Sequence, residues 1–395
     1  MVTAQPTLQD TSDFSPVLGG PLYQLWRRSF LSGPALELVR RRVVTAIALT
    51  WVPLALLSIL EGRAWSGVAL SFLRDIETHI RFLVALPVLI ASELEVHQRI
   101  RSAVKRLLDG NVIAPEDVPK FRAAIDTASR IRNSITIETA LLIFVWTVGQ
   151  WLWHTHIALT EPSWYATPHG GTFRLTLAGH WDQFVSVPAF QFILLRWYFR
   201  IFIWFGFLLR ISRFHLQLLP AHPDRMGGLG FLGESTMAFS PVLFAQGALL
   251  SGLIASRILF ENENLFSFKI LIATWVVFFV LVVLCPLLMF VPQLARAKRR
   301  GLEEYGVLSS IYVADFNKKW LPGGAKGEAI LGTADIQSLA DLVNSYAVVR
   351  RMRVVPFGLD EVKQLVVAAA APVLPLILTI MPFSELMKRI FKILF

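Results

Sequence analysis

Seven runs of apolar residues dominate the chain, and most are long enough for a helix to cross a bilayer. A hydrocarbon core about 30 Å thick needs roughly 20 apolar residues in a helix. The runs lie at Val43–Leu60, Ile80–Val96, Ile135–Trp153, Pro188–Ile211, Phe239–Phe260, Ile270–Val291 and Val366–Met381. The second has an uncharged core of only Phe82–Ser92, and Pro372 and Pro375 interrupt the last. The pattern predicts an all-α polytopic membrane protein with about seven transmembrane helices, within a range of roughly six to eight.

The composition favours the same class of protein. Only 17% of the residues are charged, whereas a soluble domain carries about a quarter. The single cysteine, Cys285, lies inside an apolar run. An intrachain disulfide and a cysteine-built zinc site are therefore excluded. Residues 1–20 lack the basic and apolar regions of a signal peptide, so we expect the first run to be an uncleaved anchor.

The basic residues predict the orientation. With the N-terminus inside, the segments 1–42, 97–134, 212–238 and 292–365 face the cytoplasm and hold 26 of the 38 lysines and arginines. Cytoplasmic loops of membrane proteins carry such an excess. This asymmetry explains the net charge of +10 without nucleic acid, which we do not expect as a partner. The partner that the pattern predicts is the lipid bilayer.

The runs divide the chain into four parts. Residues 1–42 form a cytoplasmic N-terminal segment, and residues 43–291 a six-helix bundle. The bundle has an external loop at 154–187, with a strand expected at Thr172–Leu177 and a turn at Gly179, and a cytoplasmic glycine-rich loop at 212–238. Residues 292–365 form a cytoplasmic helical module, with helices over Gln293–Trp320 and after the N-cap residue Thr333. Residues 366–395 form a kinked seventh helix and an amphipathic tail.

Charged residues inside the runs are the first candidates for a functional site. Arg196 and Arg200 lie one turn apart, on the same face of a helix. Because an unpaired arginine in the membrane costs several kcal/mol, we expect acidic partners, and Glu93 and Glu138 lie at suitable depths. Arg81, with Asp75, Glu77 and His79, is expected in an outer group near Arg196. The charges either lock helices together as ion pairs or line a path for an ion, and the sequence leaves both open.

Small residues recur every four positions in the fifth run. One stripe is Gly247, Ser251 and Ala255, and the other is Ala248, Gly252 and Ser256. Small side chains at this spacing let helices approach closely. We expect contacts within the chain, with a homo-oligomer interface as the alternative.

The loop between the fourth and fifth runs holds the second group of candidates. It contains His222, Asp224, Arg225, Gly227, Gly228 and Gly230. The glycines match neither a P-loop nor a dinucleotide-binding fingerprint, and no cofactor is expected. His215, His222 and Asp224 are weak candidates for metal ligands. The favoured interpretation is a tight re-entrant turn, with Asp224 as a cap and with Leu229, Phe231 and Leu232 entering the bundle.

Three stretches together resemble a group of uncharacterised bacterial multi-pass membrane proteins. They are Arg81–Pro87, the segment His222–Leu232 that holds the glycines, and Ala334–Leu342. The resemblance covers about residues 40–385. It implies a location in the bacterial inner membrane, and it implies no catalytic activity.

Three functions are compatible with these patterns. We expect first a channel or transporter-like protein for an anionic or proton-coupled solute. The alternatives are a membrane-embedded enzyme acting on a lipid or phosphorylated substrate through His222 and Asp224, and a scaffold or sensor whose module at 292–365 binds a cytoplasmic protein. Because no established catalytic motif is present, the sequence favours a protein that is not an enzyme.

Overall fold

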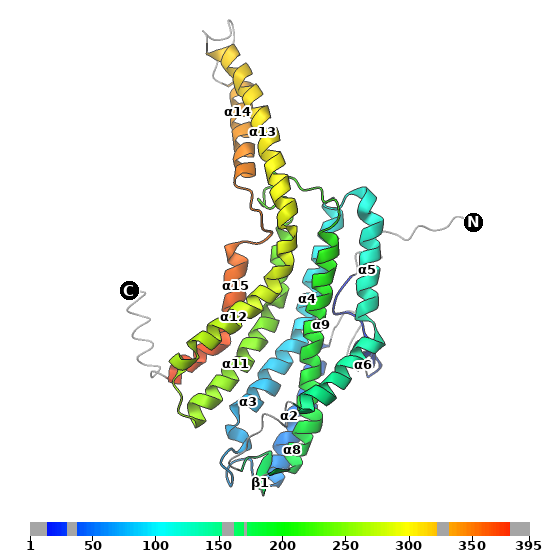
Figure 1. Ribbon diagram of the computed structural model, residues 1–395, viewed down its shortest axis with the longest axis vertical. Coiled ribbons are helices and arrows are strands. Elements are labelled where there is room, and N and C mark those ends of the chain that lie inside the picture. The colour runs from blue at the N-terminus through cyan, green and yellow to red at the C-terminus, as the bar shows by residue number, and fades with distance from the viewer. Residues whose placement is uncertain (1–13, 30–37, 152–161, 170–171, 322–331, 380–395) are drawn as a thin grey trace, which may run out of the picture.

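The computed structural model describes residues 14–29, 38–151, 162–169, 172–321 and 332–379. It shows a bundle of long helices from which one helical hairpin projects, while a small β-hairpin lies at the opposite end (Figure 1). We call these the stalk end and the β-hairpin end. The amphipathic tail, the first part of the predicted external loop and the break expected after Trp320 lie outside the described residues.

Among the described residues of the first half of the chain, six helices form the frame of the bundle. They are α1 (Pro21–Arg28), α2 (Val39–Leu60), α3 (Ile76–His79), α4 (Leu86–Asp109), α5 (Val118–Arg132) and α6 (Ile135–Phe144). Short 3-10 or π-helical turns extend them at η2 (Phe72–Arg74), η3 (Ile80–Ala85), η4 (Pro115–Asp117) and η5 (Val145–Gly149). The strands β1 (Ala166–His169) and β2 (Thr172–Leu175) then pair antiparallel.

The second half completes the bundle and forms the stalk. Its helices are α8 (Leu177–Trp181), α9 (Val187–Ile211), α10 (Phe231–Thr236), α11 (Ser240–Phe260), α12 (Lys269–Leu284), α13 (Val291–Trp320), α14 (Ala334–Arg350) and α15 (Leu359–Ala370). The turns between them are η6 (Asp182–Ser186), η7 (Met237–Phe239), η8 (Leu265–Phe268), η9 (Cys285–Phe290) and η10 (Ala371–Thr379).

Five of the described helical stretches are long and apolar enough to cross a membrane, or six if the bent pair of α5 and α6 is one span. The second predicted run is not among them, although η3 and α4 run through the buried centre of the bundle. Arg81, Glu93 and Glu95 make this helix too polar for a lipid-facing span. The fold is therefore that of a helical integral membrane protein, and the count of seven stays a prediction.

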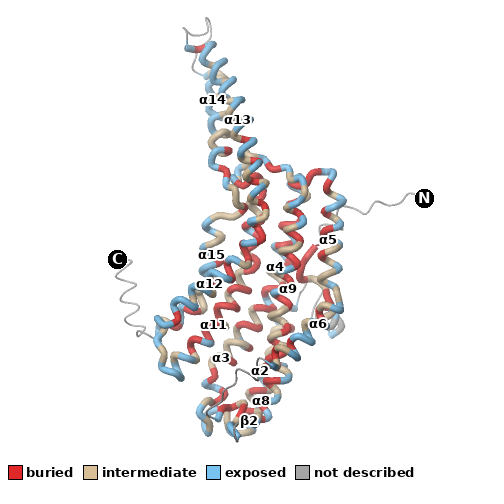
Figure 2. Tube along the Cα trace, viewed as in Figure 1, coloured by how far each residue is buried: buried red, intermediate tan, exposed pale blue. Residues whose placement is uncertain are grey.

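The outer faces of the long helices are apolar. On α12, Ile270, Val277, Phe278 and Leu281 are each more than half exposed, and Phe202 on α9 is 67% exposed. In water, large apolar patches of this kind are unfavourable, whereas hydrocarbon chains cover them at no cost. Figure 2 shows the same division, with buried residues on the inner faces and exposed ones outside.

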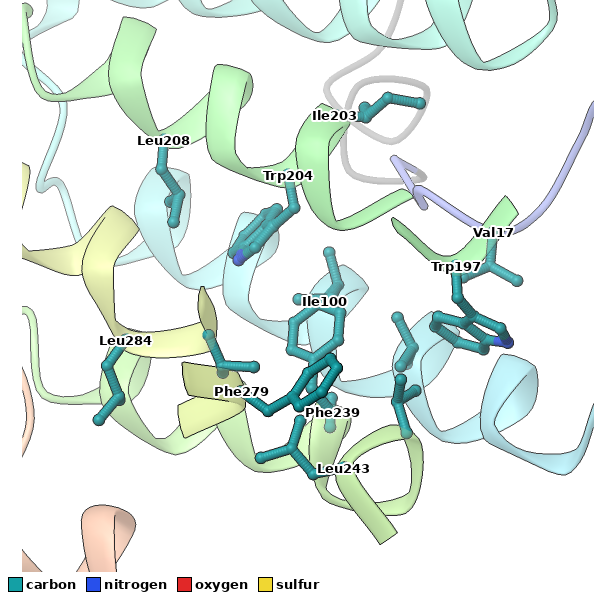
Figure 3. Close-up of a cluster of buried hydrophobic side chains, with 14 of the residues drawn as sticks. Val17, Ile100, Trp197, Ile203, Trp204, Leu208, Phe239, Leu243, Phe279 and Leu284 are labelled. Carbon is teal, nitrogen blue, oxygen red and sulfur yellow. The ribbon is translucent and has the colours of Figure 1, made fainter. Parts of the chain in front are cut away.

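The core lies where α4, α9, α11 and α12 meet. Trp204 on α9 lies beside Ile100 of α4, with Phe239 next to α11 and Phe279 of α12 close by, and Trp197, two turns earlier on α9, belongs to the same cluster (Figure 3). Trp197 is fully buried, and its indole Nε1 donates a hydrogen bond of 2.9 Å to the carbonyl oxygen of Leu89. This bond satisfies the one polar group that the ring brings into the core.

The small residues of α11 pack against other helices of the same chain. A Cβ atom on Gly247 would lie 2.0 Å from the carbonyl oxygen of Ala369 in α15, and one on Gly252 would lie 3.3 Å from the Ile80 side chain in η3. Both small-residue stripes are thus occupied by contacts within the chain.

At the β-hairpin end, the strand expected at 172–177 is present as β2, and it pairs with β1. The turn expected at Gly179 is wrong, because Gly179 lies inside α8. A Cβ atom there would lie 1.9 Å from the Tyr165 carbonyl oxygen, so this glycine is needed for close packing and not for a turn.

The stalk consists of α13 and α14, which pack along each other (Figure 1). At its base, Gly301 lies so close to the first part of the glycine-rich loop that a Cβ atom would be 2.4 Å from Pro220 Cβ and 3.1 Å from Val349 Cγ1. Five residues further along the same helix, Gly306 has no atom within 4 Å of the position of its Cβ.

These two glycines provide a matched test of the stalk base. We expect Gly301→Ala to lower the free energy of unfolding by about 1–3 kcal/mol, because the methyl group overpacks the contact with Pro220. Gly306→Ala should raise it by about 0.5–1 kcal/mol through helix propensity alone. Unfolding midpoints followed by circular dichroism in detergent test this order, and equal midpoints for the two variants would contradict the close contact.

Candidate functional site

Five charged side chains meet in the interior of the bundle. Arg42 comes from α2, Glu93 from α4, Glu138 from α6, and Arg196 and Arg200 from α9. Each of the five residues is at most 6% exposed. We call these five residues the buried charge cluster. It contains the four residues that the sequence singled out as partners, and it adds Arg42.

Glu93 lies at the centre of the cluster. One carboxylate oxygen, Oε2, accepts a hydrogen bond from Nη1 of Arg42. The other, Oε1, lies 2.8 Å from Nη2 of Arg200 and 4.0 Å from Nη1 of Arg196. Three guanidinium groups from two helices thus surround one carboxylate. An arrangement of this kind is needed because an ion buried alone in an apolar interior costs several kcal/mol.

Glu138 connects the cluster to the N-terminal part of the chain. Its Oε1 lies 3.1 Å from Nε of Arg196, and its Oε2 accepts a hydrogen bond of 2.9 Å from the backbone N–H of Leu22. Glu138 lies in the first turn of α6, which begins directly after the N-cap residue Ser134. The carboxylate therefore holds a side chain from α9 and the backbone of α1 together.

Residues 14–28 cover the cluster, and we call them the N-terminal cover. Nη1 of Arg132 donates to the carbonyl oxygen of Ser15, and the N–H of Gly20 donates to Asn133 Oδ1 at 3.0 Å. The indole ring of Trp26 lies 5.1 Å from the Arg42 guanidinium carbon, a distance typical of a cation–π contact. The cover is held by polar contacts at several points along its length.

Sequence reasoning missed Arg42 and the cover. Arg42 was counted with Arg40 and Arg41 as a marker of orientation, although it is the only one of the three that is buried. A signal was available, because Leu22, Tyr23 and Trp26 together give this segment an apolar content that indicates a helix packed on another surface.

A second polar group lies towards the β-hairpin end. Arg81 forms an ion pair with Glu77, and Asp75 accepts hydrogen bonds from Thr78 and from the Trp164 indole at 2.8 Å. The sequence predicted Arg81 near Arg196. Among the described residues, Arg81 pairs with Glu77, whereas Arg196 pairs with Glu93 and Glu138.

An apolar layer separates the two polar groups. From Arg81 to Glu93 the chain rises about 18 Å at 1.5 Å per residue. In between, Phe82, Leu89 and Ile90 are buried, and the Phe82 ring lies 6.3 Å from that of Phe190 in α9. Among the described residues, this layer leaves the buried charge cluster without a polar connection to the group at the β-hairpin end.

In the glycine-rich loop, Asp224 organises the backbone. Its carboxylate accepts hydrogen bonds from the N–H groups of Met226, Gly228 and Gly230 at 2.7, 3.2 and 2.9 Å. Nδ1 of His222 lies 2.8 Å from the same carboxylate. Partial burial disfavours the charged form, but these donors outweigh it and hold the pKa of Asp224 below its ordinary value.

The glycines allow the backbone to wrap around this carboxylate. Gly227 and Gly228 have φ angles of +66° and +92°, and Arg225 adopts +56°. The loop is also docked: the Arg225 carbonyl oxygen accepts a hydrogen bond of 2.7 Å from the N–H of Arg353. Leu229 and Leu232 are fully buried, and Phe231 is half-buried, as the turn interpretation expects. The loop therefore anchors the base of the stalk to the bundle.

The metal candidates lie in two separate places. His215 is near Asp117, with its Nδ1 3.4 Å from Asp117 Oδ2, whereas His222 contacts Asp224. Within the ranges that the structure describes, no group of three or more histidine, cysteine, aspartate or glutamate side chains is arranged to hold a metal ion.

Comparison of the chain with protein-family models, with curated proteins and with solved structures finds no match. The resemblance noted from three sequence stretches therefore stays a prediction. Fold and site define a helical membrane protein with a buried, covered cluster of charges.

The role of Asp224 is testable through pH. A lowered pKa adds stability that is present above the ordinary value of 3.8 and is lost as the pH falls through the folded-state pKa. We expect Asp224→Asn to lower the free energy of unfolding by about 1–2 kcal/mol at neutral pH. The difference from wild type should begin to shrink below about pH 4, where the unfolded wild-type chain takes up a proton, and it should shrink further as the pH falls through the lower folded-state pKa.

Unfolding midpoints measured between about pH 3 and pH 7 test this expectation. Asp126→Asn is the control, because Asp126 is exposed on α5. A difference between wild type and Asp224→Asn that stays constant over this range would contradict the role of the carboxylate.

Proposed function

We propose that this chain is a channel or transporter-like protein for a small anionic solute, and that the buried charge cluster is its solute site. The observation that carries the proposal is the balance of charge in the cluster. Among the described residues, the cluster consists of three arginines and two glutamates, so its five members together carry a formal charge of +1 in the interior of the bundle. A mobile anion bound there would balance this charge.

The chemistry of arginine supports an anion at this place. A guanidinium group offers five N–H donors in a rigid plane and binds oxyanions through two parallel hydrogen bonds. Arg200 uses Nη2 on Glu93 and lies 5.0 Å from the Trp197 ring. An arriving anion can exchange with a glutamate at a guanidinium that is already oriented.

Space for a solute exists next to Arg42. A cavity of about 160 Å³ lies between α1, α2 and α9, with Arg42, Thr45 and Thr50 as its polar lining and Trp26 and Phe192 among its apolar walls. A water molecule occupies about 30 Å³, so this cavity is large enough for a small hydrated anion.

The structure corresponds to a closed state in this proposal. The N-terminal cover lies over the cluster on one side, and the apolar layer around Phe82 and Phe190 closes the other. Transport then requires the release of the cover and a movement of the apolar layer. Carriers that expose a site to one side at a time need two such barriers.

Orientation and location belong to the same proposal. The excess of lysine and arginine in the segments near the stalk end supports a cytoplasmic stalk and N-terminus. Together with the resemblance to bacterial multi-pass proteins, it supports a place in the bacterial inner membrane. In this orientation, the cover would open towards the cytoplasm.

One observation favours a scaffold as the second candidate. The stalk exposes large apolar side chains, with Val307, Leu308 and Ile311 on α13 and Val343 on α14 each more than half exposed. Such a surface fits a protein partner. The measurement of flux separates the two candidates, since a scaffold carries no solute in liposomes.

The solute site is tested first at Arg200. In proteoliposomes, we expect Arg200→Gln to reduce the flux of chloride, nitrate or inorganic phosphate by at least about tenfold, because the site loses its charge and most of its N–H donors. Arg200→Lys should retain part of the flux, since the charge remains. Proton flux measured in the same vesicles shows whether transport is coupled.

Arg210→Gln is the control for Arg200→Gln, because Arg210 lies on the same helix but is exposed. Size-exclusion chromatography confirms that each variant folds. Wild-type liposomes without flux of these anions, or unchanged flux in a folded Arg200→Gln protein, would contradict the proposal.

The cover is tested at Leu22. Leu22→Pro removes the N–H that bonds to Glu138, and proline is tolerated there because residue 22 lies in the first turn of α1. We expect the flux to rise by about two- to tenfold, because losing one hydrogen bond to a charged group makes the release of the cover more favourable by a comparable factor. Leu22→Ala shortens the same side chain but keeps the N–H, so its flux should stay near that of wild type. Equal flux in the two variants would show that this bond does not hold the cover closed.

A further inference from the structure

A cleft on the lateral face of the bundle is separate from the buried charge cluster. It lies between α9, α11 and α12, and its volume is about 500 Å³. Binding sites for small molecules range from about 300 to 1,000 Å³. Its walls are mostly apolar and include Phe190, Leu194, Leu250 and Trp275.

The cleft opens sideways, towards the surface that the bilayer covers. Leu253 and Leu271, which line it, are 38% and 41% exposed, and both belong to helices apolar enough to span a membrane. At one end, the ion pair of Arg81 and Glu77 is part of the lining. A molecule dissolved in the hydrocarbon phase can therefore enter the cleft without passing through water.

The floor of the cleft contains a polar group with an unused donor. Gln246 is 2% exposed, and its Oε1 accepts a hydrogen bond of 3.2 Å from the Tyr198 hydroxyl. Its backbone carbonyl oxygen accepts another of 3.2 Å from the Trp275 indole. Its amide nitrogen Nε2 is buried and has no hydrogen-bond partner among the described residues. A buried donor left without a partner costs about 1–3 kcal/mol.

We infer that this cleft binds an apolar molecule that carries a carbonyl group, and that Nε2 of Gln246 donates a hydrogen bond to the carbonyl oxygen. The apolar walls favour a molecule that is mostly apolar, and the amide N–H of Gln246 favours one that carries a hydrogen-bond acceptor. Two membrane components have this chemistry: the ester groups of glycerolipids and the rings of lipid-soluble quinones. The inference is independent of the solute proposed for the buried charge cluster.

Lipids without carbonyl groups allow a direct test. We would reconstitute the full-length protein in nanodiscs of a di-ether phosphatidylcholine and titrate them with decylubiquinone, following the unfolding temperature. A quinone site predicts a saturable rise in this temperature. An ester-lipid site predicts instead that the protein unfolds at a higher temperature in dioleoylphosphatidylcholine than in the ether lipid, before any quinone is added.

Variants then connect the effect to the amide. Gln246→Leu keeps the size of the side chain and removes the donor, so we expect the half-saturating quinone concentration to rise roughly tenfold, or the preference for ester lipid to disappear. Gln98→Leu is the matched control, because it makes the same substitution at an exposed position of α4 outside the cleft; its effect should stay below about threefold.

A second variant tests the cleft without touching its floor. Leu253→Trp fills the opening from an exposed position, and it should abolish both the saturable rise and the difference between lipids. The inference is overturned if neither quinone nor ester lipid raises the unfolding temperature. It is also overturned if Gln246→Leu responds as wild type does, or if binding persists unchanged in Leu253→Trp.

Discussion

The carboxylate of Glu93 has to be neutralised inside an apolar bundle, and much of the architecture serves this requirement. Removing one partner of a buried ion pair costs about 3–5 kcal/mol, so Arg42, Arg196 and Arg200 must be present together. They fix how α2 and α9 lie against α4. Glu138 then brings α6 and the N-terminal cover to the same place. Helices that in lipid have little hydrophobic drive to associate are thereby given a defined arrangement.

A second carboxylate shows the same principle with a different set of donors. Asp224 is surrounded by backbone N–H groups rather than by arginines, and the glycines near it supply the required backbone angles. Because its two oxygens accept three backbone hydrogen bonds within the loop, this aspartate acts as a structural centre for the base of the stalk. Glu93, by contrast, is neutralised by guanidinium groups of side chains from two other helices. The loop that looks most like a motif in the sequence is thus explained by the contacts of its own backbone.

The lengths of the apolar runs and the positions of the charged residues within them made the all-helical fold class and four members of the buried charge cluster predictable. Arg200 must find an acid wherever it is buried, and only a few acids lie at its depth, so Glu93 and Glu138 followed from the sequence. Arg42 did not, because a basic residue at the end of a span has the same pattern whether it faces water or the interior. The turn placed at Gly179 was wrong for a related reason: glycine permits both a turn and a close approach of backbones, and only the packed structure separates the two.

The helix α9 carries both candidate sites. Tyr198 lies two residues from Arg196 and two from Arg200, and two residues correspond to about 200° around a helix. The arginines therefore face the centre of the bundle while Tyr198 faces the lateral cleft. A helix moves as a rigid unit, so a rotation of α9 that releases Arg200 from Glu93 must also shift Tyr198 against Gln246. Under the two proposals, a ligand in the cleft that favours one position of α9 would therefore also shift the state of the cluster, and such linkage would act equally in both directions.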